Sequence, residues 1–237
     1  MDAPTDLPRR TDGFLERGAA LTRLEAFVDA AFAFAVTLLV ISLDAIPASI
    51  PAMLEALKGV PAFAASFAQI MLFWAAHVTW SRRFGLDDAR SALLSLVLVF
   101  LVLVYVYPLK ILFASFFAWA SGGWLPAVAP IHSLDDLQGM FVVYALAFGT
   151  LSVCMVMLNR HALRAPVSPP LDAGERLAVR AEVVRWWYAV VVAALSMAAA
   201  LWLLPVVPPG WMFGLPGMLY GLLGLTHLVV ARWAEAR

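Results

Sequence analysis

Six stretches of mostly apolar residues, each long enough to cross a bilayer, constrain this chain more than any other feature. Their estimated bounds are 23–43, 61–81, 91–113, 137–158, 183–206 and 211–232. A hydrocarbon core of about 30 Å is crossed by about 20 helical residues. Lipid offers no hydrogen bonds to free backbone groups, and the sequence shows no alternating barrel-type strands. We therefore expect an all-α integral membrane protein that forms one six-helix domain over residues 1–237.

The composition fits the same class of protein. Hydrophobic residues make up 63% of the chain and charged residues 14%, with a mean hydropathy of +0.87. Soluble domains are roughly half apolar and about a quarter charged. The sequence contains no phosphate-binding glycine loop and no nucleophile elbow, and its histidines lack ligand spacing. It therefore predicts no enzyme, no metal centre, no cofactor and no binding to nucleic acid; the lipid bilayer is the first expected partner.

The basic residues predict how the helices are oriented. Apart from Lys58 and Lys110, all of them fall in the N-terminal segment, the second and fourth connections and the C-terminus: Arg9, Arg10, Arg17 and Arg23; Arg82, Arg83 and Arg90; Arg160, Arg164, Arg176, Arg180 and Arg185; Arg232 and Arg237. Cytoplasmic loops carry an excess of Lys and Arg. We expect a multi-pass protein of the cell's inner (plasma) membrane with both termini in the cytoplasm.

A carboxylate inside the first span marks a candidate site. Asp29 lies six residues beyond Arg23, about 9 Å into the helix, and His77 lies five residues before Arg82 on the antiparallel second span, at a similar depth of about 7–8 Å. Trp74 shares a face with His77. A buried Asp costs about 2.5–3.5 kcal/mol at mid-membrane depth. We expect a polar cluster of Asp29 and His77, with Arg23 or Arg82 near enough to neutralise it; alternatively, each group reaches water or a local carbonyl.

Other polar residues suggest helix ends. Acidic residues at three predicted helix starts are expected to act as caps and helix-dipole partners: Asp87 and Asp88, Asp135 and Asp136, and Asp172. The connection 44–60 could form a brief helix at the membrane interface.

Three strings in the first 115 residues resemble one family. RLEAFVDAAFAFAVTLL (residues 23–39) resembles the first-helix signature of the transmembrane protein 175 family, usually an Arg followed after three residues by Phe-Ser-Asp and a pore helix rich in Ala, Ile, Thr and Leu. SFAQIMLFWAAHVTWSRRF and DDARSALLSLVLVFLVLVYVYP are similar to the second and third helices, with Trp74, His77 and Pro108 in the expected places. The resemblance implies a potassium-permeable channel of six-helix subunits. Bacterial members assemble as homotetramers, with helix one lining a pore for monovalent cations.

Two residues depart from the family pattern. Val28 replaces the serine of Phe-Ser-Asp, so a hydroxyl that relatives have there is missing. Phe34 stands where relatives usually place Ile or Leu at the narrowest ring of the pore. A ring of Phe side chains could block conduction, alter selectivity or turn aside to leave an aperture.

One stripe of the first helix is the candidate pore lining. At about 100° per residue, the following residues share a narrow stripe: Phe27, Ala30, Phe34, Thr37, Leu38, Ile41 and Ala45. Phe34, Thr37, Leu38 and Ile41 are the predicted pore-lining and constriction residues, with the Thr37 hydroxyl as the nearby side-chain oxygen. Selectivity would then arise at a hydrophobic constriction. An apolar stripe alone more often marks ordinary packing, and the family resemblance is what favours a pore.

Two alternatives remain beside the channel. In a secondary or proton-coupled transporter, Asp29 and His77 would titrate during the cycle. In a non-conducting structural subunit, no transport would occur. Asp29 lies off the stripe, which counts against the first alternative, and Phe34 keeps the second open.

Overall fold

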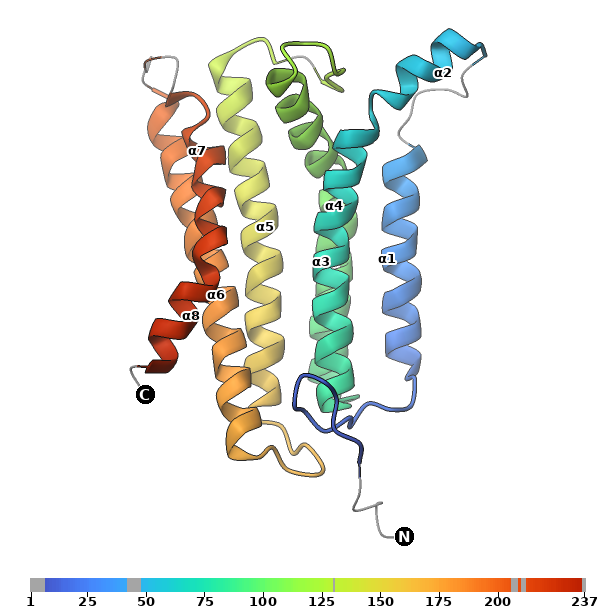
Figure 1. Cartoon of the computed structure of the whole chain (residues 1–237), viewed down its shortest axis with the longest axis vertical. Helices are drawn as coiled ribbons and strands as arrows, with labels where there is room; N and C mark the ends of the chain where they lie inside the picture. Colours follow the sequence, from blue (N-terminus) through green and yellow to red (C-terminus); the bar gives the residue numbers. More distant parts are fainter. Residues whose placement is uncertain (1–6, 42–47, 130, 206–208, 210–211, 236–237) are drawn as a thin grey trace.

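The protein forms a bundle of long helices that run along a common axis (Figure 1), as a computed structural model shows for residues 7–41, 48–129, 131–205, 209 and 212–235. The long helices are α1 (Arg23–Ile41), α3 (Val60–Phe84), α4 (Ala89–Ala120), α5 (Leu134–Ala162) and α6 (Ala173–Leu203). The short α2 (Ile50–Leu57) lies within the connection expected to form an interfacial helix. The chain ends with α7 (Leu215–Met218), the 3₁₀ helix η2 (Leu219–Leu225) and α8 (Thr226–Glu235). The all-α fold is confirmed.

Five stretches of the described residues are long and apolar enough to cross a membrane. They are α3, α4, α5, α6 and the run Leu215–Glu235. The nineteen residues of α1 include Arg23, Glu25 and Asp29, and α1 is not among the five. Six spans therefore remain a prediction.

Helix lengths differ from the predicted spans for two physical reasons. The 32 residues of α4 and the 31 residues of α6 continue beyond the expected spans, because a capped helix need not stop where a bilayer core stops. The expected sixth helix, 211–232, is divided within its described part into α7, η2 and α8. Pro216 lies in the first turn of α7, and glycines at 221 and 224 weaken helix propensity within η2.

Local side-chain bonds define several helix starts. Asp88 caps α4 by accepting a hydrogen bond from the Ser91 N–H. Ser133 with Asp136 and Asp172 with Glu175 form reciprocal capping boxes at α5 and α6. Each side chain accepts from one of the backbone N–H groups that a helix start leaves unpaired. These observations confirm the expected caps at positions 88, 136 and 172.

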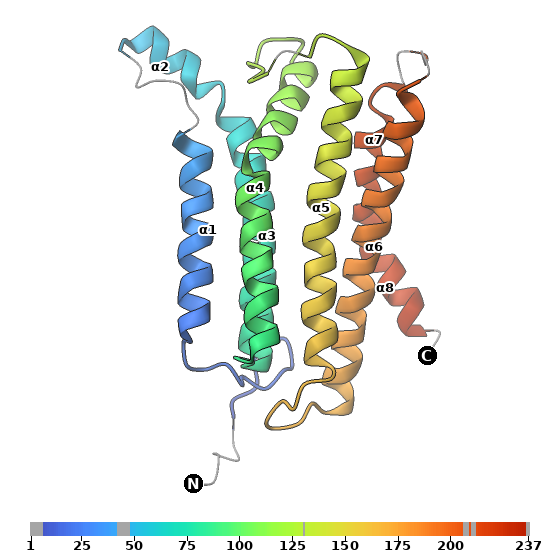
Figure 2. The same ribbon diagram turned by 180° about the vertical axis from the view of Figure 1, so that it is seen from behind.

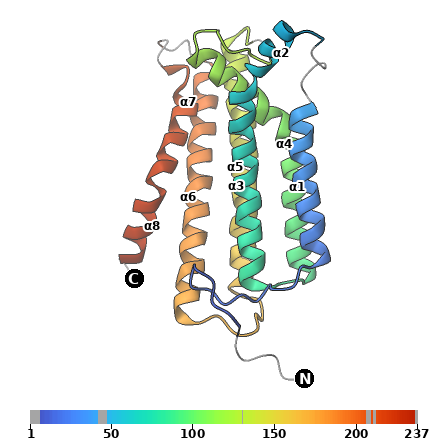
Figure 3. The same cartoon turned by 45° about the vertical axis from the view of Figure 1, so that its right-hand side comes forward.

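The helices form a row in which α1 occupies one edge. Figures 1 and 2 place α3 and α4 between α1 and α5, and Figure 3 shows α1 at one side of the bundle with α6, η2 and α8 toward the other. Accordingly, α1 packs on α3 and α4, and α5 makes its most extensive contacts with α6. The chain's N-terminal segment, the α3–α4 connection and the α5–α6 connection lie at the same end of the bundle (Figure 1). The arginines of these three regions therefore gather at one end.

Candidate pore helix and polar cluster

The start of α1 is closed by a capping box. The Thr22 N–H donates to Glu25 Oε2 at 2.8 Å, and the Glu25 N–H donates to Thr22 Oγ1 at 3.1 Å. The Glu25 residue is 7% exposed. This exchange satisfies two donors of the first turn and explains a carboxylate in an otherwise apolar run.

Asp29 and His77 have different direct partners. The indole Nε1 of Trp74, on α3, donates to Asp29 Oδ1 at 2.8 Å and thereby joins α3 to α1. The buried His77 places Nε2 2.9 Å from the Ser95 hydroxyl on α4. Trp74 and His77 lie one turn apart, so two polar bonds hold α3 to its neighbours at nearly one level. The direct contact of Asp29 is with Trp74, whereas the sequence analysis expected His77.

Neither candidate arginine forms an ion pair with Asp29 in the described residues. Arg82 donates from Nη1 to the carbonyls of Gly18 at 2.9 Å and Ala19 at 3.1 Å. Arg23 is exposed at the first residue of α1. Arg82 instead binds carbonyls of the N-terminal segment, for which no structure was predicted from the sequence.

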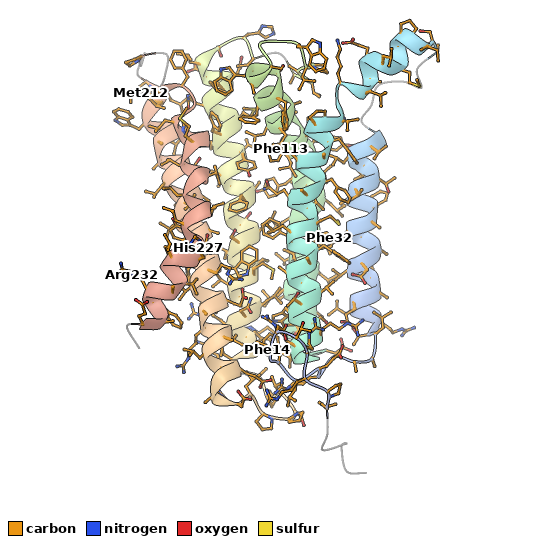
Figure 4. The ribbon with its side chains drawn as sticks, in the orientation of Figure 1. Phe14, Phe32, Phe113, Met212, His227 and Arg232 are labelled. Carbon is orange, nitrogen blue, oxygen red and sulfur yellow. The ribbon has the colours of Figure 1, made fainter. Side chains whose placement is uncertain are left out.

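The two faces of α1 differ sharply in exposure. The buried face consists of Val28, Phe32, Ala35 and Leu39, each at most 1% exposed. Figure 4 places the labelled Phe32 between α1 and α3. The name exposed face is used here for the following residues of α1: Ala26, Phe27, Ala30, Ala33, Phe34, Thr37 and Val40. Apart from the Thr37 hydroxyl, this exposed face is apolar.

The predicted pore residues fall at different places on α1. Phe34 is 54% exposed, and Thr37 is exposed while its hydroxyl donates to the Ala33 carbonyl at 2.9 Å. That bond uses the hydroxyl hydrogen and leaves oxygen lone pairs to accept a further bond or contact a cation. Leu38 is partly buried and packs against the core. Ile41 ends the helix, and its side chain, like Ala45, lies outside the described residues. The exposed face is thus turned from the predicted stripe, away from Leu38 and toward Ala33.

Residues 7–22, here called the N-terminal strap, form an ordered structure that the sequence analysis missed. The strap begins with an antiparallel bridge between Arg9 and Leu15 and continues to the start of α1. Phe14 is 2% exposed and meets Phe84 edge-on at 6.1 Å between ring centroids. A single buried aromatic residue within a polar, arginine-rich segment is the signal that could have indicated this structure.

A carboxylate within the strap is held in its charged form. Burial of Asp12 tends to raise its pKa, but hydrogen bonds from the Phe14 N–H and the Arg83 side chain outweigh it, so the pKa lies below the ordinary value. The guanidinium of Arg83 also lies 4.2 Å from the Phe14 ring centroid. These contacts fix the strap turn against the last turn of α3.

Comparison with known proteins places this geometry in context. Residues 23–108 match the family model described as "Endosomal/lysosomal potassium channel TMEM175". A protein of Marivirga tractuosa described as a potassium channel is 42% identical over 110 residues, which are 46% of this chain and 44% of that protein. The match therefore spans less than half the length of that relative. A crystal structure of a variant of the potassium channel MtTMEM175, in complex with a nanobody–MBP fusion protein, superposes with a TM-score of 0.82 at 26% identity; it covers 97% of this chain and 100% of that one.

Proposed function

Because this chain belongs to the TMEM175 family, we propose that it is a potassium-permeable cation channel. The names of the family and of both matched proteins describe ion conduction and not catalysis. The structural likeness extends over nearly the whole chain, beyond the residues that the family model matches.

The single observation that carries the pore assignment is the exposed face of α1. Within the part of the chain that the structure describes, this face is exposed at an edge of the bundle, and it combines large apolar side chains with the Thr37 hydroxyl. One helix cannot enclose a pathway, so several copies of the chain must contribute α1 around a shared axis. We propose a homotetramer, as the family resemblance implies.

Phe34 and Thr37 give this pore a constriction and an oxygen. The 54% exposed Phe34 would meet its symmetry copies at one level, and a narrow apolar ring gates by excluding water. Thr37, one turn further along α1, offers oxygen lone pairs on the same face. Potassium preference would then arise where ions lose part of their hydration shell.

Arginine placement supports the proposed membrane topology. The chain would span the inner (plasma) membrane six times, with α1 as a full span and the arginine-rich end of the bundle in the cytoplasm. Both termini would then lie in the cytoplasm, because the N-terminal strap and the basic end of α8 belong to that half of the molecule (Figure 1).

Potassium flux from liposomes tests the proposal. Purified protein in vesicles loaded with potassium should release the ion without a proton gradient. If potassium release strictly requires a proton gradient, the channel proposal is wrong and the proton-coupled transporter, in which Asp29 and His77 titrate, is favoured. If the correctly folded oligomer shows no potassium flux, the remaining alternative is a non-conducting structural subunit.

Cross-linking tests the proposed self-assembly separately. Cys154 is the single cysteine of the chain, so Cys154→Ala gives a cysteine-free background. In that background Thr37→Cys should link adjacent subunits, whereas a cysteine at Leu72, exposed on α3, serves as a control for random collision. A clean monomer in detergent and in membranes would contradict the proposal.

A further inference from the structure

The N-terminal strap connects α1 to a part of the bundle that α1 does not pack against. Within the described residues, α1 rests on α3 and α4. The strap, by contrast, reaches the first turn of α6 and the connection before it. Its last residues lead directly into α1.

Arg17 is the centre of this connection. Its guanidinium donates from Nη2 to Glu175 Oε2 at 2.7 Å and from Nη1 to Glu175 Oε1 at 2.9 Å. Its Nε donates to the Pro169 carbonyl at 2.8 Å. The side chains of Arg17 and Glu175 are 1% and 2% exposed. A planar guanidinium fork can make these directed bonds together, and an ammonium group cannot reproduce that geometry.

Glu175 fixes the other side of the connection. Besides receiving Arg17, it accepts from the Leu15 N–H at 2.8 Å and from the Asp172 N–H at 3.0 Å as part of the α6 capping box. The same carboxylate therefore defines where α6 begins and where the strap lies. A displacement of the α6 start must either carry the strap with it or break several buried charge-assisted bonds.

Only a short segment of the strap lies between its last anchored residues and α1. The Gly18 N–H donates to the Arg82 carbonyl at 3.1 Å, and Arg82 in turn holds the carbonyls of Gly18 and Ala19. Three residues, 20–22, then separate these held carbonyls from the first residue of α1. A segment this short transmits a shift of its anchored end to the helix that follows.

We propose that the N-terminal strap positions the pore helix α1 relative to α6, with Arg17 as the positioning residue. Movement of the α6 start changes the placement of the first turns of α1, and thereby the equilibrium between conducting and non-conducting arrangements. Arg17 acts through the strap and touches no permeating ion. The conduction part of this inference rests on the proposed channel function; the mechanical part does not.

Two matched substitutions test the inference in the intact oligomer. Arg17→Lys keeps the charge but loses the fork geometry. Arg9→Lys, in the same strap, alters an ion pair with Asp172 whose side chains are 57% and 46% exposed. Hydrogen–deuterium exchange of the α1 amides from Glu25 to Val28 reports local opening, and single-channel recording reports open probability.

The expected result separates the two variants. Arg17→Lys should speed exchange in the first turns of α1 by about tenfold, the scale of losing a charge-assisted bond, and should change open probability. Unitary conductance and ion preference should persist, because the exposed face of α1 is unaltered. Arg9→Lys should change none of these.

Faster exchange confined to the strap, with α1 as in the wild type, would overturn the inference. If Arg17→Lys does not assemble, Phe14→Leu applies the same test, since it loosens the strap at Phe84 without removing a buried charge. If the wild-type protein conducts no potassium, the proposed function fails, and the exchange of α1 still decides whether the strap positions it.

Discussion

Two phenylalanines two residues apart on α1 allow the pore face to be tested against the core face. Phe34 is 54% exposed and Phe32 is 1% exposed. Truncating a fully buried Phe to Ala costs about 3–5 kcal/mol. Scaling this cost by the buried share of Phe34 gives about 2 kcal/mol for Phe34→Ala, against the full cost for Phe32→Ala.

The difference is large enough to measure as thermal stability. For a chain of this size, 1 kcal/mol shifts Tm by about 2–4 °C. Phe32→Ala should therefore lower Tm by roughly 10 °C, and Phe34→Ala by roughly half as much or less. Both variants are followed by thermal unfolding of the purified oligomer, with potassium flux from liposomes measured in parallel.

Function should change in the opposite order. Phe34→Ala removes most of an apolar ring from the proposed axis, so potassium flux should rise and discrimination against sodium should weaken while the oligomer persists. Phe32→Ala should reduce flux only as far as it reduces folded protein. If Phe34→Ala destabilises the protein as much as Phe32→Ala and leaves flux unchanged, Phe34 is a packing residue and α1 does not line the pore.

Three further substitutions test the pore face, the polar cluster and a helix cap. Thr37→Val keeps the volume of the side chain but deletes the oxygen, so expression should persist while the ratio of potassium to sodium permeability falls; an unchanged ratio would move the filter elsewhere. Trp74→Phe removes the donor to Asp29 and should lower the free energy of unfolding by about 1.5–3 kcal/mol in denaturant titrations, with no comparable loss for Trp119→Phe at an exposed position. The pKa of Asp88 is lowered from 3.8 to about 2, because hydrogen bonds from Ser91 and His161 outweigh the effect of burial; its stabilising contribution is therefore present above about pH 4 and lost as the pH falls toward 2. Asp88→Asn should flatten that part of the curve of Tm against pH, and an unaltered curve would show that Asp88 makes no such contribution.

The sequence predicts those features that repeat along the chain or lie close together in it. Apolar runs of bilayer length locate the long helices, and Asp88, Asp136 and Asp172 act locally, so their capping roles follow from their position before an apolar run. The full length of α4 does not follow, because bilayer thickness sets no limit on a helix that continues outside the core. The break at η2 depends on weak helix propensity around glycine and on packing against α6, which periodicity does not report.

The polar cluster shows where reasoning from depth alone stops. Matching depths predicted that Asp29 and His77 lie at one level; the structure joins Asp29 to Trp74 and His77 to Ser95. The hydrogen-bond partner of each side chain depends on how its helix is rotated about its own axis, and depth alone does not specify this rotation. The strap remained hidden because Arg17 and Glu175 are 158 residues apart and neither belongs to a recognisable motif.

Two glycines in the strap contacts restrict which sequences can adopt this fold. A methyl group on Gly18 would lie 2.4 Å from the Ser81 carbonyl oxygen, and one on Gly85 would lie 2.7 Å from the Arg17 carbonyl oxygen. Gly85 also has a φ of +57°, which disfavours other residues. Both obstacles are main-chain atoms, so no change of a neighbouring side chain can make room. A homologous chain that carries larger residues at both positions must join its first helix to the bundle by a different route.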